Sequence, residues 1–214
     1  MAIDIWDHAT DTWSTAALSQ RRKKPEAVAA GTKIVIAGGE IAKNSRWRRR
    51  RRRLDYTSVV DIFDVVTREW TTAKLSLARQ YFGAAGIGDL AIFAGGFYDD
   101  VREGVVDIYN ARTGTWSVAQ PLSAARSNLH ATVVAGRYAV FGGGTAAGVG
   151  RSSAIDVFDA QTGSWAATNG SMCGAPYGIA GVGQIALFAG GVECATHNVT
   201  ARVAALAIGA GAVC

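Results

Sequence analysis

Residues 61–70, which read Asp-Ile-Phe-Asp-Val-Val-Thr-Arg-Glu-Trp, decide the fold because nearly the same string returns four times along the chain. Every copy has Asp, then Ile or Val, then an aromatic residue, then Asp or Asn, with Thr and Trp following at fixed distances. Such regularity indicates an internal repeat. The copies are residues 4–13, 61–70, 107–116 and 156–165.

A pair of glycines follows each copy. The pairs begin 25, 25, 27 and 25 residues after the Trp, so a unit of roughly fifty residues recurs, a period typical of β-propeller blades. The repeat motifs span residues 3–39, 60–96, 106–144 and 155–191. The recurring residues to which we assign a structural role are Trp13, Trp70, Trp116, Trp165, Gly38, Gly39, Gly95, Gly96, Gly143, Gly144, Gly190 and Gly191.

Each unit is patterned as four short strands, which we call a to d. Residues 27–39, 84–96, 131–144 and 178–191 each hold two apolar runs separated by a glycine, the pattern of a β-hairpin of strands a and b. The Asp-apolar-aromatic segment predicts strand c, and the Trp lies in strand d. Four antiparallel strands joined by short turns make one propeller blade.

The order of glycine pair, aromatic residue and Trp resembles the kelch-repeat family, and the resemblance covers about residues 3–191. It implies an all-β, kelch-type β-propeller of about four repeats in one domain, residues 1–214. The family also favours an Arg at the start of strand a. Arg22, Arg79 and Arg126 fit this position, whereas Gly174 stands there in the last copy.

The chain enters the repeat at strands c and d and leaves it after an a-b pair. These two halves could complete one blade and close a small ring of four blades, or the chain could be part of a larger propeller, which we favour. Residues 192–214 lack the Asp, Thr and Trp of the repeat. We interpret them as a degenerate tail that could supply a strand c.

One loop departs from the repeat. From Gly38 to Asp61 the chain takes 23 residues, against 12 and 13 in the next two units, so residues 42–53 are an insertion. Seven arginines occupy residues 46–53, and without them the formal net charge of +5 would be −2. Such a tract is typical of a solvated low-complexity loop, of a nuclear-import signal, or of a site for phosphate-rich partners that would bind polyanions or nucleic acid through residues 46–53.

Topology places this loop on the same face as the connections from strand d to strand a, because the chain crosses the blade twice between them. The candidate binding face therefore joins the Arg-rich loop to those connections and to the next b-c loop. Its residues are Arg22, Lys23, Arg46, Trp47, Arg48, Arg50, Arg79, Gln80, Tyr98, Arg126, Ser127 and Asn128.

The sequence predicts no catalytic residue, no metal site and no cofactor. His8, His130 and His197 are isolated, and Cys173, Cys194 and Cys214 lack metal-type spacing. Kelch-like propellers also include a copper oxidase and sugar-modifying enzymes, for which Arg79, Arg126 and Glu103 could be considered. A carbohydrate-active enzyme or oxidase therefore stays open as an alternative to a non-catalytic protein-protein interaction module, whose partner the sequence does not identify.

Composition agrees with a chain of many short strands, since 49% of the residues are hydrophobic and 26 of 214 are Gly, with only three Pro. No run of apolar residues is long enough to span a membrane as a helix. The repeat begins at once after Met1, which leaves no room for a signal peptide. We therefore expect a cytoplasmic or nuclear protein.

Overall fold

The computed structural model describes residues 2–41, 55–169, 178–190 and 203–208. Within those ranges strands are the only regular elements, which confirms the predicted all-β class. The strands form small antiparallel sheets arranged as the blades of a kelch-type propeller. The Arg-rich insertion, residues 42–53, lies outside the described residues.

Three complete blades follow one another, and in each the strands pair antiparallel in chain order. Blade 1 comprises β3 (Glu26–Ala30), β4 (Lys33–Ala37), β7 (Val59–Asp64) and β8 (Trp70–Lys74). Blade 2 comprises β9 (Gly83–Ile87), β10 (Leu90–Ala94), β13 (Val106–Asn110) and β14 (Thr115–Ala119). Blade 3 comprises β16 (His130–Val134), β17 (Tyr138–Gly142), β20 (Ala154–Asp159) and β21 (Ser164–Asn169).

An incomplete blade lies at each end of this series. The half-blade is the two-stranded sheet of β1 (Ala2–Asp7) and β2 (Thr12–Ala17), which correspond to strands c and d. Blade 4 contains β22 (Gly178–Val182), β23 (Ile185–Ala189) and β24 (Val203–Ala207), which correspond to strands a, b and c. Part of the degenerate tail thus occupies the strand-c position, because β24 pairs with β23 over its whole length.

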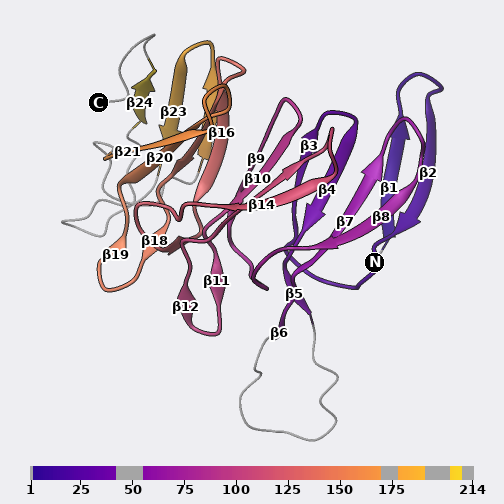
Figure 1. Cartoon of the computed structure of the whole chain (residues 1–214), viewed down its shortest axis with the longest axis horizontal. Coiled ribbons are helices and arrows are strands. Elements are labelled where there is room, and N and C mark those ends of the chain that lie inside the picture. Colours follow the sequence, from indigo (N-terminus) through magenta and orange to yellow (C-terminus); the bar gives the residue numbers. More distant parts are fainter. Residues whose placement is uncertain (1, 42–54, 170–177, 191–202, 209–214) are drawn as a thin grey trace, which may run out of the picture.

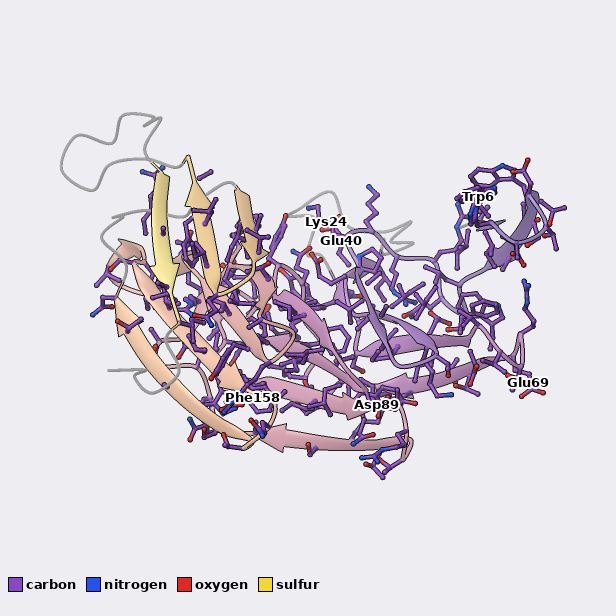
Figure 2. The ribbon with its side chains drawn as sticks, turned by 90° about the horizontal axis from the view of Figure 1, so that it is seen from above. Trp6, Lys24, Glu40, Glu69, Asp89 and Phe158 are labelled. Atoms are coloured by element: carbon purple, nitrogen blue, oxygen red, sulfur yellow. The ribbon has the colours of Figure 1, made fainter. Side chains whose placement is uncertain are left out.

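The blades form an open arc, with the half-blade at one end and blade 4 at the other (Figures 1 and 2). The half-blade does not complete blade 4, because β24 already occupies the edge of β23 that β1 would need. The described residues therefore do not form the closed ring of four blades that was one of the two arrangements considered from the sequence.

The hydrophobic core is divided among the junctions between blades. One cluster lies between blades 1 and 2, around Val35 and Phe93, a second lies between blades 2 and 3, around Phe141, and a third joins blades 3 and 4 through Phe188. Because each blade buries its apolar residues against its neighbour, a blade without a neighbour leaves such residues exposed.

Glycines permit the close approach of blades. A Cβ on Gly86 of β9 would lie 1.9 Å from the carbonyl oxygen of Ala29 in β3, so no side chain fits there. Gly39 has a φ of +106° and donates its N–H to the carbonyl oxygen of Arg79 in blade 2, at 3.0 Å. The glycine pair at the end of strand b thus links successive blades.

Short β-ladders extend from one face of the arc, where the b-c loops lie (Figure 1). They are built from β5 (Glu40–Ile41) with β6 (Asp55–Tyr56), β11 (Phe97–Tyr98) with β12 (Val101–Arg102), and β15 (Arg126–Ser127) with β18 (Thr145–Ala146) and β19 (Gly150–Arg151). Isolated bridges join Lys23 to Glu40 and Gln80 to Phe97. The d-a connections and b-c loops therefore share a face, as the topology predicted.

No helix among the described residues is long and apolar enough to cross a bilayer.

Candidate functional site at the mouth of the arc

The arginine at the start of strand a is buried in all three complete blades. Arg79 and Arg126 are 0% exposed, and Arg22 is 2% exposed. Arg22 and Arg79 each lie 2.7 Å from the Asp of their own strand c, Asp61 and Asp107. Arg126 pairs with Asp156 in the same way. We call each of these Arg-Asp pairs a clasp.

The clasp also joins three parts of the blade backbone. Asp107 accepts the N–H of Ser76 at 3.0 Å, and Arg79 donates to the carbonyl oxygens of Phe93 and Gly95 in and after strand b, at 3.0 and 2.8 Å. Equivalent Asp contacts hold Ser19 and Ser123. The clasp therefore fixes the d-a connection to strands b and c, and burial lowers the pKa of Arg79 and Arg126.

This arrangement corrects part of the candidate binding face. Arg22, Arg79 and Arg126 are buried in ion pairs within their own blades, so none presents an accessible guanidinium group to a partner or to a sugar substrate. Gln80 and Ser127 are 1% and 3% exposed and pair through their backbone with the b-c loops. The sequence suggested that these residues lie at the surface. Their burial depends on partners in other strands of the blade, which the position in the repeat does not indicate.

Three candidates do lie at the surface. Lys23 and Asn128 are exposed at the starts of two blades. Tyr98 is 39% exposed, and its ring contacts the ring of Tyr56 with centroids 5.6 Å apart. The remaining candidates, Arg46, Trp47, Arg48 and Arg50, lie outside the described residues.

The residue two places after each clasp arginine has a left-handed backbone. Lys24, Tyr81 and Asn128 have φ values of 52°, 57° and 55°. Non-glycine residues seldom adopt this conformation, and such residues concentrate at functional sites. We call these three residues the rim, since they turn the chain from the b-c face into strand a.

The rim residues contact one another across the blade junctions. The Nζ atom of Lys24 lies 2.5 Å from the hydroxyl oxygen of Tyr81 and 4.7 Å from the centre of its ring. The hydrogen bond to Tyr81 raises the pKa of Lys24. Asn128 donates its N–H to the carbonyl oxygen of Tyr81 at 2.8 Å. Figure 2 shows Lys24 beside Glu40, whose carboxylate it also approaches, on the inner side of the arc.

A cavity of about 560 Å³, which we call the mouth pocket, opens next to the rim. Residues with small apolar side chains or none form its floor, among them Gly83, Ala84 and Ala131. Polar side chains surround this floor and come from the starts of strands a and from the b-c ladder of blade 3. They are Glu26, Tyr81, Asn128, His130, Thr145 and Arg151.

Burial shifts the titration of two of these groups in opposite directions. Desolvation raises the pKa of Glu26 and lowers the pKa of His130, because burial disfavours the charged form of either group. The pocket therefore combines hydrogen-bond donors and acceptors with an apolar floor. These are the features that a peptide or small polar ligand requires of a binding site.

Sequence reasoning missed most of this pocket. His130 was seen only as an isolated residue at the start of a strand, and Glu26, Tyr81, Thr145 and Arg151 carried no motif. A signal did exist, because Lys24, Tyr81 and Asn128 occupy the same place in three repeats and are large or polar where a turn would favour Gly. Among the described residues no group of His, Cys, Asp and Glu could hold a metal ion.

The Trp residues of the complete blades lie against aromatic partners. Trp70, Trp116 and Trp165 are half-buried, and each contacts the aromatic residue of strand c, as Trp116 does with Tyr109 at 5.0 Å between ring centroids. Trp13 differs from the expectation, since it is 71% exposed in the half-blade. Gly191 lies outside the described residues, and the other glycines of the pairs have positive φ.

Comparison with known proteins finds relatives in Arabidopsis thaliana. The F-box/kelch-repeat proteins At1g74510, At1g26930 and SKIP11 are each 27% identical to this chain over 120 to 123 residues. The match takes in 55% of this chain but only about a quarter of each relative. No protein-family model matches the chain. The repeats, the blades and these relatives together support a kelch-repeat family.

Proposed function

We propose that this kelch-repeat chain is a non-catalytic protein-protein interaction module whose partner docks on the rim and the mouth pocket. Kelch-repeat relatives support an interaction role in general terms. Within the molecule, the carrying observation is the rim itself, where three successive blades each present a left-handed, non-glycine residue beside one pocket.

The rim residues keep their left-handed backbone within a well-connected part of each blade. The clasps and the glycine pairs fix the backbone just before each rim residue, as in the Gly39 N–H to Arg79 carbonyl bond, so less backbone ordering is needed when a partner binds. Exposed Lys23 and Tyr98 extend the same face toward the b-c loops. Together these residues give a mixed polar and aromatic surface around an apolar floor, as in many recognition sites.

Selection of peptides from a displayed library on the folded chain tests this proposal. The double variant Tyr81→Ala with Asn128→Ala should weaken the selected peptides by about tenfold or more, because both residues line the pocket. Val118→Ala, on the exposed side of strand d in blade 2, is the matched control and should leave affinity unchanged. If Val118→Ala weakened peptide binding and the double rim variant did not, the proposed site would be wrong.

A second candidate function is binding of polyanions by the Arg-rich insertion. It is favoured by the Lys23 to Glu40 bridge, which brings Arg21, Lys23 and Lys24 next to Ile41, the last described residue before the insertion. Arg22 does not contribute, because Asp61 neutralises it within the blade.

Titration with single-stranded nucleic acid at several salt concentrations tests this candidate. Affinity should fall steeply with salt, since each neutralised phosphate releases a condensed counterion. Deletion of residues 42–53 should abolish binding and leave the strand content unchanged, because the sister blades form without such an insertion. Arg112→Gln, on a c-d turn at the opposite face, serves as control. An affinity that does not change with salt or with the deletion would mean that the insertion is a solvated loop without a role in binding.

A further inference from the structure

The first residue of strand a differs in charge among the three complete blades, and this difference concerns the mouth pocket. The position lies four places after the clasp arginine and is Glu26 in blade 1, Gly83 in blade 2 and His130 in blade 3. All three residues line the pocket. Blade 1 therefore contributes an acid here, whereas blade 2 contributes no side chain.

The carboxyl group of Glu26 is desolvated without being paired. Glu26 is half-buried, and burial alone raises its pKa. Among the described residues, none forms a hydrogen bond or an ion pair with its side chain. By contrast, the partly buried Asp64 and Asp159 are held by Lys33 and Arg137. A carboxylate that has lost water and gained no partner stays unfavourable until a ligand supplies one.

Arg151 is the basic group of the pocket. It is half-buried in β19 and lies opposite Thr145 of β18, so the b-c ladder of blade 3 fixes its backbone. No hydrogen bond or ion pair joins its side chain to another described residue. Burial lowers the pKa of His130 on the same blade, so that imidazole is largely neutral at neutral pH and adds little charge.

The two charges of the pocket do not neutralise each other. Glu26 belongs to blade 1 and Arg151 to blade 3, and no ion pair joins them. Blade 2 stands between them, with Gly83 and Ala84 on the pocket floor. A ligand that satisfies both must carry a cation and an anion at separate places along its length. A segment of polypeptide has this form, whereas a nucleic acid would place negative charge beside Glu26.

We propose that the mouth pocket selects a segment of a partner protein that carries a basic and an acidic side chain, the basic one bound to Glu26 and the acidic one to Arg151. This inference rests on the proposed function, in which a partner docks at the rim. Hydrogen bonds between charged groups are stronger than those between neutral groups, and one at each end fixes the direction in which the segment crosses the three blades.

A set of synthetic peptides measures this selectivity and leaves the chain unaltered. Each peptide carries one Lys and one Glu, separated by spacers of increasing length made of Ala and Ser, and a fluorescent label. Binding to the full chain is followed by fluorescence anisotropy. At the spacing that fits the pocket, replacing the Lys of the peptide with Gln, or its Glu with Gln, should each weaken binding by about tenfold or more.

Variants of the chain assign each preference to one residue. Glu26→Gln should remove the preference for Lys in the peptide, and Arg151→Gln should remove the preference for Glu. Both variants should keep the urea midpoint, because neither side chain has a partner among the described residues. Glu69→Gln and Arg112→Gln, on exposed c-d turns, are the matched controls and should keep both preferences.

A charge exchange gives the test a positive result to look for. The double variant Glu26→Arg with Arg151→Glu should prefer the peptide in which the order of Lys and Glu is reversed. Equal binding of the charged peptides and their Gln counterparts would overturn the proposal, as would the absence of binding at every spacing.

The peptides selected from the displayed library separate this proposal from the proposed function. If they lose affinity with the double variant Tyr81→Ala with Asn128→Ala but not with Glu26→Gln or Arg151→Gln, the partner docks at the rim without this charge selection. The proposed function would then stand and the present inference would be wrong. If none of these variants changes the affinity, the partner docks elsewhere and both are wrong.

Discussion

At the scale of single residues, the Arg79 to Asp107 clasp shows how a charged pair can be part of a propeller core. Both side chains are buried, yet each polar contact runs to a backbone group or to the other member of the pair. A buried pair of this kind is costly to break, because removal of one partner leaves an uncompensated charge.

The clasp gives the first prediction. Asp107→Asn keeps an acceptor for the Ser76 N–H but removes the charge opposite Arg79, so the free energy of unfolding should fall by about 3 to 5 kcal/mol. Asp89→Asn is the control, since the contact of Asp89 with Arg112 is 3.5 Å long and exposed. Urea unfolding followed by circular dichroism measures both. Similar midpoints for the two variants would mean that the clasp does not stabilise the blade.

His130 gives a second prediction, on pH. Burial lowers its pKa from the ordinary 6.5, so the unfolded chain binds more protons than the folded chain between those two pKa values. Stability from this group is therefore full above about pH 7.5 and is lost as the pH falls through 6.5 and the lower folded pKa. His130→Gln should flatten the decline of the urea midpoint between about pH 7.5 and pH 5.

Two features make that pH comparison specific. Glu26, in the same pocket, has a raised pKa and changes stability in the opposite sense, but it is present in both proteins and cancels in the comparison. His8→Gln, in the exposed c-d turn of the half-blade, is the control and should keep the decline. A decline unaltered by His130→Gln would show that burial of His130 is not its origin.

At the scale of elements, the tryptophan of strand d packs against strand b of its own blade in blades 2 and 3. Trp116 stacks on Phe93 of β10 and contacts Tyr109 of β13, whereas β2, which carries Trp13, pairs only with β1 among the described strands. Trp116→Ala should lower the free energy of unfolding by about 2 to 3 kcal/mol, below the roughly 3 to 5 of a fully buried aromatic, because Trp116 is only half-buried.

Trp13→Ala is the matched comparison, since the two tryptophans occupy the same position in the repeat. With 71% of Trp13 exposed, its removal should change the midpoint of chemical unfolding little. If Trp13→Ala destabilised the chain as much as Trp116→Ala, the half-blade would be packed in solution and the open arc would be wrong.

The sequence predicted the elements well and the site poorly, for a physical reason. The a-b hairpins follow from alternating apolar residues around a turn glycine, as in β9 and β10 around Gly88, and this pattern is local. The burial of Arg79 cannot be predicted from its neighbours in the sequence, because it depends on the ion pair with Asp107, which lies 28 residues further along the chain. The pocket involves residues still further apart in the sequence, since Glu26 comes from blade 1, Tyr81 from the start of blade 2, and His130 and Arg151 from blade 3.

At the scale of the whole molecule, the arc brings three repeated turns to one mouth. The rim residues Lys24, Tyr81 and Asn128 are far apart in sequence and contact one another in space. Since the clasps use the arginines internally, the surface offered to a partner consists of the residues that follow them. The repeat thus separates the residues that hold the blades from those that are free to bind.

Amide hydrogen exchange of the full chain, with and without a peptide selected on it, locates the docking surface. Exchange should become slower on binding around residues 23–26, 80–84 and 127–131, with the c-d turns at residues 64–70, 110–115 and 159–164 unchanged. Protection of the c-d turns with no change at the rim would contradict the claim that the partner docks at the mouth of the arc.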